Sequence, residues 1–215
     1  MPWMSLWTVP WFLLEVKGYS KLYDNISDYG IPYALFSTVW FLFFTDCLIY
    51  WIHRWLHHPI LYHLHKPHHL WKVPTPFASH AFHHLDGYAQ SLPYHIFIML
   101  FPLHKFIYLG LFVFVNIWTI SIHDQVYVAH DSFLNGAAHH TIHHLEFNYN
   151  YGQYFTLWDK IGGSYKVPEK QFQEIELKKR IKVDENDKNS VDEGDVANHS
   201  TSTSNARANN LKQRA

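Results

Sequence analysis

The sequence is poor in cysteine and in charge of either sign. Its one cysteine, Cys47, allows no disulfide within the chain, which excludes the small secreted scaffolds that disulfides hold together. The 17 Lys and Arg nearly balance the 18 Asp and Glu, and they form no basic stripe. Because nucleic-acid binding depends on clustered cations that neutralise phosphates, this balance excludes nucleic acid as a partner.

Aromatic and polar residues are also spread unevenly along the chain. All nine Trp precede residue 166, whereas Lys, Glu, Asp, Asn and Ser dominate from there onward, and no aromatic residue follows Phe172. Such a segment cannot bury enough apolar surface to offset the entropy lost on ordering it. We therefore expect a polar, disordered tail over 166–215, lying in the cytosol.

Two long apolar runs predict membrane segments. Residues 31–52 would form a helix about 33 Å long at ~1.5 Å per residue, enough to cross a hydrocarbon core of ~30 Å. A buried core helix is the alternative. The second run, 92–122, is interrupted over 101–105 by a proline, a histidine and a lysine. Proline breaks helices and charge resists hydrocarbon, so we expect a break between two segments, 92–101 and 106–122. Histidine-rich sequence lies on both sides of this run and must converge on one site, so we expect a hairpin or re-entrant pair that returns to the same membrane face.

The first thirty residues differ from both runs. Residues 1–16 carry Trp3, Trp7 and Trp11 in the manner of an interfacial aromatic belt, but they are too few to span a bilayer. They lack the basic region and cleavage site of a signal peptide, so we expect the chain to begin inside what is ordinarily a longer membrane region. A polar loop follows over 17–30.

These patterns predict an all-α integral membrane protein with three regions. An N-terminal apolar remnant and polar loop occupy 1–30, a membrane domain 31–165, and the polar tail 166–215. The transmembrane helices would carry a histidine-rich domain.

The sequence is rich above all in histidine, with 18 of its 19 histidines between 53 and 144. Three clusters, HRWLHH, HKPHH and HTIHH, repeat spacings of three and four residues, which on an α-helix place side chains on one face. Each cluster thus offers two or three imidazoles to one point, as metal sites require. The candidate ligands are His53, His57, His65, His68, His69, His140, His143 and His144.

Eight imidazoles exceed the four ligands of one tetrahedral zinc, so the clusters imply two metal ions. Imidazole suits iron, zinc, copper and nickel alike, and spacing alone does not choose among them. The sequence has no HExxH motif and no Glu-x-x-His pairs, which excludes zinc-protease and carboxylate-rich di-iron sites. A loose zinc-binding histidine tract would lack the fixed spacing. We interpret His63, His95, His104, His130 and His199 as ordinary surface or core residues.

Longer motifs surround the clusters: FLFFTDCLIYWIHRWLHH, LHKPHHLWKVPTPFASHAFHH and GAAHHTIHHLEFNYNYGQYFTLWDKIGGSY. With them the chain resembles, over about 12–166, the sterol C-5 desaturases (Δ7-sterol 5(6)-desaturases) of the fatty acid hydroxylase superfamily. PTPFASHAFH and YNYGQYFTLWD are the segments most typical of that branch. The resemblance implies a multi-pass enzyme of the endoplasmic reticulum membrane that introduces the C5–C6 double bond into a Δ7-sterol. It further implies two non-haem irons, O2, and electrons from NAD(P)H through cytochrome b5 and its reductase. The domain over 31–165 would then be catalytic, with its histidine clusters on the cytosolic side of the membrane.

The resemblance also implies ligands beyond the eight cluster histidines, because the superfamily uses a further histidine between the second and third clusters. His83 and His123 are the candidates for this position. His84 stands where the family has proline, which leaves open which of His80, His83 and His84 points inward.

Four carboxylates near the clusters could orient the imidazoles by accepting their second N–H: Asp46, Asp86, Asp124 and Asp159. We prefer Asp124, which directly follows His123. The sterol should lie between 31–52 and 92–122, with Trp40, Phe97 and Trp118 as candidate lining residues.

Several other functions remain compatible with the sequence. A sterol or fatty-acid hydroxylase would share the same di-iron centre, and a truncated, inactive paralogue would keep the clusters by descent. A membrane zinc transporter or storage protein would also be rich in histidine. It would need polar residues along a transmembrane path, however, and the clusters lie outside the apolar runs.

Overall fold

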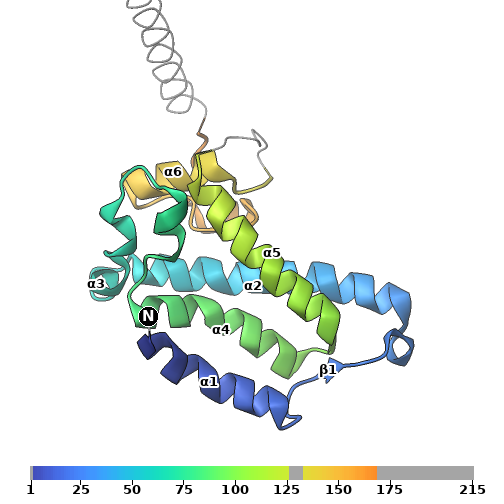
Figure 1. Cartoon of the computed structure of the whole chain (residues 1–215). Helices are drawn as coiled ribbons and strands as arrows, with labels where there is room; N and C mark the ends of the chain where they lie inside the picture. The colour runs from blue at the N-terminus through green and yellow to red at the C-terminus, as the bar shows by residue number, and fades with distance from the viewer. Residues whose placement is uncertain (1, 126–132, 169–215) are drawn as a thin grey trace, which may run out of the picture. The chain divides into compact units, whose positions relative to one another are not determined.

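Helices make up nearly all the regular structure of the described residues, 2–125 and 133–168 of a computed structural model (Figure 1). The long helices are α1 (Pro2–Val16), α2 (Gly30–Leu56), α4 (His84–Leu100) and α5 (Lys105–His123). Shorter elements are α3 (Tyr62–His65), α6 (Ala137–Glu146), α7 (Leu157–Gly162), the 3-10 helices η1 (Ile26–Asp28), η2 (His68–Leu70) and η3 (Pro76–His80), and the strands β1 (Leu22–Tyr23) and β2 (Leu103–His104). The tail predicted over 166–215 falls outside the described residues from 169 onward.

Two of the helices, α2 and α5, are long and apolar enough to cross a membrane. Only 33% of the most apolar window of α2 and 22% of that of α5 are buried within the protein. Large apolar side chains such as Leu35 and Val39 on α2, and Phe106 and Ile117 on α5, are more than half exposed. A soluble core helix would bury these side chains, so their exposure indicates contact with lipid. The chain is thus a mostly helical membrane protein.

The apolar run 92–122 forms parts of two helices that meet at a sharp turn. Helix α4 begins at His84, eight residues before the apolar run, and ends at Leu100. Helix α5 begins at Lys105 and returns toward α6, so the hairpin turns at the predicted interruption (Figure 1).

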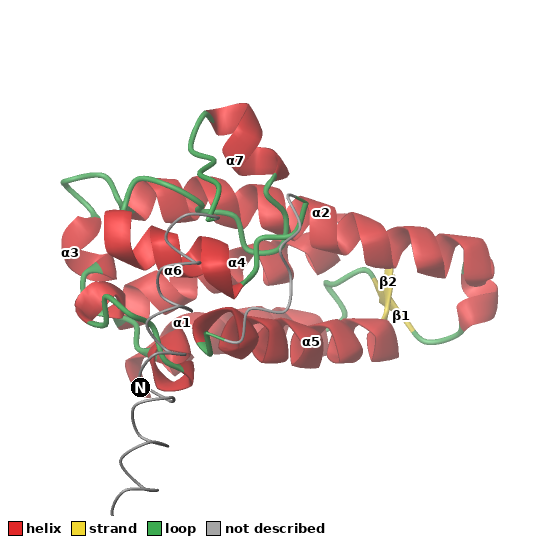
Figure 2. Cartoon of the chain, turned by 90° about the horizontal axis from the view of Figure 1, so that it is seen from above, coloured by secondary structure: helices red, strands yellow, loops and turns green. Residues whose placement is uncertain are grey.

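The polar loop predicted over 17–30 is more ordered than expected, because β1 pairs in parallel with β2 from the hairpin turn. Figure 2 shows these strands far from α6, beside the first half of α2.

Aromatic and aliphatic side chains fill the space between α2, α4 and α5. Phe41 and Phe97 meet edge to face with their ring centroids 5.0 Å apart. The other buried members of this core are Ile98, Leu103, Leu111, Val115 and Tyr154. Trp40, Phe97 and Trp118 were candidates for lining a substrate site. Phe97 is fully buried in the core, and the two tryptophans pack against it, so all three stabilise the helix packing.

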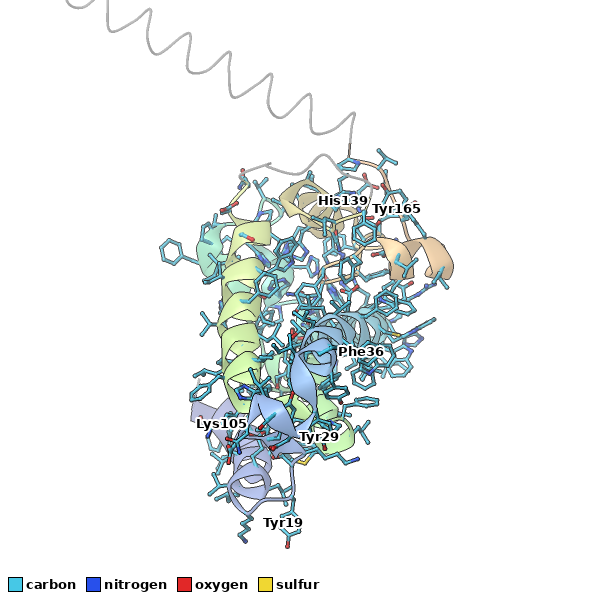
Figure 3. All side chains as sticks on the ribbon, turned by 90° about the vertical axis from the view of Figure 1, so that its right-hand side faces the viewer. Tyr19, Tyr29, Phe36, Lys105, His139 and Tyr165 are labelled. Atoms are coloured by element: carbon cyan, nitrogen blue, oxygen red, sulfur yellow. The ribbon has the colours of Figure 1, made fainter. Side chains whose placement is uncertain are left out.

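The ends of the molecule differ in chemistry. Figure 3 shows Tyr19, Tyr29 and Lys105 at one end, and His139 and Tyr165 at the other, with Phe36 between them. Because α2 and α5 both finish near the end that carries His139, the histidine-bearing segments gather there.

Candidate metal centre

Four separate segments bring histidines to this end of the molecule. The last turn of α2 supplies His53 and ends at its cap, His57. The segment from α3 to η2 supplies the second cluster, α6 supplies the third, and α5 ends at His123. Residues far apart in the sequence thus share one buried site.

The histidines form two groups, each with its ligand atoms within 4.8 Å of one another. The five-histidine group consists of His53, His57, His65, His69 and His143. The four-histidine group consists of His68, His123, His140 and His144. Nine of the ten candidate ligands therefore come together, and they form two adjacent sites, as the count of imidazoles predicts.

Each cluster places two imidazoles in one group, as the spacing predicts, but one further histidine of the second cluster and one of the third join the other group. On α6, His140 and His144 are four residues apart and share a group, whereas His143 joins the other group. The second cluster does not lie on one helix, because α3 ends at His65 and Pro67 separates it from η2. His68 then points to the four-histidine group, while His65 and His69 point to the five-histidine group. Each of these two clusters therefore supplies histidines to both groups.

All six close imidazole contacts within the groups are made by Nε2 atoms. In the five-histidine group, the Nε2–Nε2 distances are 3.1 Å for His53–His65, 3.2 Å for His57–His69 and 3.1 Å for His69–His143. In the four-histidine group, they are 3.3 Å for His68–His123, 2.9 Å for His123–His140 and 3.1 Å for His140–His144.

The opposite ring nitrogens face acceptors that have no hydrogen to give. Nδ1 of His53 donates to the Tyr151 carbonyl at 2.9 Å, and Nδ1 of His143 donates to the Tyr149 carbonyl at 2.8 Å. In the same way, Nδ1 of His144 donates to the Trp71 carbonyl, Nδ1 of His123 to the Thr119 carbonyl, and Nδ1 of His65 to the Asp86 carboxylate. Nδ1 must therefore carry the proton in these five rings, and each Nε2 directs a lone pair inward.

This arrangement fits metal ions. His53 and His65 bring two such lone pairs to 3.1 Å, where neither nitrogen can donate a hydrogen bond to the other. A bound cation would convert this repulsion into coordination, and the outward Nδ1 bonds would hold each ring in the required orientation. The donor set of each group therefore fits one metal ion.

Burial keeps the imidazoles in the neutral form that binds metal. Burial, together with neighbouring imidazoles, lowers the pKa of His57 to about 2 and that of His144 to about 3. Burial also lowers the pKa values of His68, His140 and His143 well below their usual range. Protonation does not compete with metal at neutral pH.

Asp86 contacts a ligand candidate, and the preferred carboxylate, Asp124, is the C-cap residue of α5. Asp86 is fully buried on α4, 2.8 Å from Nδ1 of His65, and it accepts a second hydrogen bond from Gln90. Asp86 was one of the four carboxylate candidates, and the start of α4 brings it to His65 of the second cluster.

Asp46 and Asp159 position the backbone that follows α6. Asp46 accepts hydrogen bonds from the backbone N–H groups of Gln153, Tyr154 and Phe155. Asp159 accepts from those of Tyr151 and Gly152, and burial raises the pKa of Asp159 to about 6.

The NYNYGQYF segment holds ligand candidates through its backbone, a role that sequence motifs do not reveal. Its carbonyls at Tyr149 and Tyr151 bind His143 and His53. Gly152 has no room for a side chain, since an added Cβ would overlap the Phe155 carbonyl and meet Asp159 at 3.0 Å. The unusual density of Tyr, Asn and Gly beside the third cluster was the available signal for this segment.

His83 is the candidate that the structure does not bring to either group. It is the N-cap of α4, and its Nδ1 accepts the backbone N–H of Leu85 at 3.3 Å. His80 and His84 are outside the groups as well. His63, His95 and His104, predicted to be ordinary residues, are also outside them; His95, for example, lies 3.1 Å from Glu15. His130 and His199 lie outside the described residues.

A cavity of about 350 Å³ adjoins the four-histidine group. Its wall includes His68, His123 and His140 of this group, but only His53 of the five-histidine group. The remaining lining is largely apolar and comes from α1, α2, α4, α5, η3 and the segment after α6. On another side, a shallow depression lined by His57, Tyr62 and Phe147 leads to the five-histidine group.

Comparisons with known proteins agree with this site. The sequence model of the fatty acid hydroxylase family matches residues 38–164. The chain is 64% identical over 174 residues to lathosterol oxidase of Rattus norvegicus, covering 78% of the chain and 58% of that protein. It is 59% identical over 179 residues to the Delta(7)-sterol 5(6)-desaturase of Leptosphaeria maculans, covering 82% of the chain and 50% of that protein.

A third relative, the Delta(7)-sterol 5(6)-desaturase of Eremothecium gossypii, is 56% identical over 196 residues, with 90% of the chain and 56% of that protein covered. The chain thus spans little more than half the length of these curated relatives. No solved structure matches it. On the strength of the matched residues and the two histidine groups within them, the chain belongs to the fatty acid hydroxylase family.

Proposed function

We propose that the chain is the catalytic part of a sterol desaturase that introduces the C5–C6 double bond into a Δ7-sterol, with O2 as oxidant. One observation carries the proposal: two adjacent all-histidine groups, one of which opens into an apolar cavity between membrane helices. The names of the relatives, lathosterol oxidase and Delta(7)-sterol 5(6)-desaturase, support the substrate class and the position of the new bond.

We propose two iron ions as the metals, one in each group. An unactivated ring C–H bond is beyond the reach of side-chain acids and bases, so a redox-active metal pair must supply the oxidising power with O2. The protein's own residues would do the rest: the nine imidazoles would hold the metals, and backbone carbonyls and Asp86 orient five of those imidazoles. His83, implied as a ligand by family resemblance, stays a proposal that a metal-bound structure would test.

The cavity would position the sterol. Its apolar wall replaces water around the ring system, and His68, His123 and His140 bring the four-histidine group to that wall. Because displacement by about 1 Å can cost on the order of a hundredfold in rate, the walls must hold C5 and C6 firmly. Removal of two neighbouring hydrogens, as opposed to hydroxylation, depends on that placement.

We propose that electrons reach the centre from NAD(P)H through cytochrome b5 and its reductase, and that the protein is in the endoplasmic reticulum membrane. The histidine groups and the tail would then face the cytosol. The gathering of all nine histidines at or just beyond the C-terminal ends of α2 and α5 supports a site at one membrane face. It argues against a metal transporter, whose ligands would follow a path across the membrane.

A sterol or fatty-acid hydroxylase is the second candidate, favoured by the description of the matching family. The same two groups would serve it, so the product distinguishes the two functions. An inactive paralogue would bind metal and give no product.

The test is expression of the chain in a host that lacks its own C-5 desaturase. We expect 5,7-diene sterols, identified by their ultraviolet absorption, and two irons per chain by elemental analysis. His68→Ala and His143→Ala should each abolish the diene, whereas His95→Ala, a buried histidine outside both groups, should retain it. A hydroxylated sterol, zinc in an active preparation, or no product from the iron-loaded chain would contradict the proposal.

A further inference from the structure

The largely apolar cavity contains a polar pair beside the four-histidine group. Gln153, from the segment after α6, donates its side-chain N–H to the hydroxyl of Thr119 on α5 at 2.8 Å, and both residues line the cavity. Thr119 is one helical turn before His123, and its carbonyl accepts the Nδ1 proton of that histidine at 2.6 Å. Thr119 therefore connects the pair to the four-histidine group, because its carbonyl orients His123 at the end of α5.

Both members of the pair keep hydrogen-bonding capacity for a ligand. The Thr119 hydroxyl accepts from Gln153, and its own hydrogen has no acceptor among the described residues. The side-chain carbonyl of Gln153 has no donor among them either. Most other polar groups of the wall are engaged: Ser91 donates to Tyr88 O, Asn116 to Phe112 O, and Gln90 to Asp86. One donor and one acceptor, side by side, are what an alcohol requires.

The chemistry of the proposed substrate requires such an anchor near the metal. A sterol has one polar group, the hydroxyl on C3, and C3 is only two carbon–carbon bonds from C5. The hydroxyl must therefore bind close to the atoms that react, at the inner end of the cavity. Residues one turn apart on a helix are ~5.4 Å apart along its axis and share a face, so Thr119 lies at a suitable distance from His123.

We propose that Thr119 and Gln153 bind the 3-hydroxyl of the sterol, which deepens the function proposed above and rests on it. Thr119 donates to the hydroxyl oxygen, and the Gln153 carbonyl accepts the hydroxyl hydrogen. The sterol then lies with ring A innermost. Its side chain extends toward Phe112, a cavity residue two turns back along α5 that is 47% exposed.

This contact would select substrates as well as place them. A site with a buried donor and acceptor discriminates against analogues without the matching group, because its own polar atoms are then left unpaired. The 3-methyl ether of a Δ7-sterol cannot donate a hydrogen bond and carries an extra methyl group. It should therefore bind more weakly than the free alcohol.

The test measures sterol binding to the metal-free full chain in lipid nanodiscs, with a tritiated Δ7-sterol displaced by the unlabelled alcohol or by its 3-methyl ether. We expect the wild type to prefer the alcohol by roughly tenfold, the worth of one hydrogen bond. Thr119→Val and Gln153→Met should each remove most of this preference, and Thr119→Ser should restore it. Ser121→Ala is the matched control on α5, because Ser121 is outside the cavity and its hydroxyl donates to Trp118 O.

The result separates this inference from the proposed function. If the wild-type chain binds the alcohol and the ether equally, or if both variants keep the wild-type preference, the subsite is wrong even where diene is formed. If the preference disappears in the variants while the iron-loaded chain yields no diene, the subsite stands and the desaturase function fails. Should Thr119→Val not fold, Gln153→Met and the wild-type comparison of the alcohol with the ether still test whether the subsite binds the 3-hydroxyl.

Discussion

The two histidine groups use the same ligand atom but differ in what surrounds them. In the five-histidine group, His65 is paired with the buried carboxylate of Asp86, and His57 borders a depression at the surface. In the four-histidine group, His123 and His144 are held by backbone carbonyls, and three of the four rings face the apolar cavity. Identical side chains thus build one group that faces an apolar cavity and one that is backed by a carboxylate.

This difference indicates that the two groups have different roles. The group with fewer protein ligands leaves more room around a metal for other ligands, and it is the group that the cavity reaches. A carboxylate behind an imidazole increases the basicity of that ligand and stabilises the oxidised metal. We therefore expect substitutions in the two groups to have different effects on metal content.

The largest effect should follow from loss of a ligand in either group. His123→Ala and His143→Ala should each reduce diene formation below detection, because both metals are needed at once. Elemental analysis should show the loss of about one metal per chain in each case, and the double variant should be no less active than either single one. If each single variant kept substantial activity, the two groups would not form one centre.

A smaller effect should follow from Asp86→Asn, which keeps the shape of the side chain and removes its charge. We expect metal affinity of the five-histidine group to fall by roughly 10–100-fold, the usual cost of losing such a partner, while the four-histidine group keeps its metal. Competition with a chelator, followed by elemental analysis, would measure this. Glu15→Gln, which alters the carboxylate next to His95, is the control. Equal loss from both groups would contradict the assignment of Asp86 to one of them.

Acidification should destabilise the metal-free protein. Burial lowers the pKa of His57 to about 2 and that of His144 to about 3, whereas the unfolded chain titrates near pH 6.5. Between these values the unfolded chain binds more protons than the folded one, so stability is complete above about pH 6.5 and falls as the pH drops toward 3. Thermal unfolding in nanodiscs at pH 7.5 and pH 5 would measure the change. A melting temperature that rises on acidification would show that the imidazoles are not buried as neutral groups.

The smallest effect should come from Lys105→Met, at the end of the molecule opposite the histidines. Lys105 lies 2.7 Å from Asp24, and both side chains are largely exposed, so solvent screens their attraction. We expect metal content, melting temperature and diene formation to stay within error of the wild type. A clear loss of metal would mean that this end of the molecule is coupled to the histidine groups. The losses measured for the other variants would then not report on the histidine groups alone.

Much of this architecture could be predicted from local patterns. Apolar length predicted the helix at 31–52, and Pro102, with His104 and Lys105 close behind, predicted the turn between α4 and α5. Histidine spacing predicted a two-metal site, because the ligand count alone exceeded one ion. The strand pairing of β1 with β2 could not be predicted, since two residues in each strand carry too little pattern and the pairing joins segments eighty residues apart.

The sequence by itself determined which residues could bind metal and how many ions they could hold, because imidazole chemistry and helical spacing are local properties. Tertiary structure alone decided which of those imidazoles belong to the five-histidine group and which to the four-histidine group. Pro67 interrupts the helix and sends His68 to one group and His65 to the other, and the end of α5 brings in His123 while His83 caps α4. It also decided that Asp86, one of four candidate carboxylates, contacts His65, because that contact depends on how α4 packs beside α3, and packing is set by the whole core.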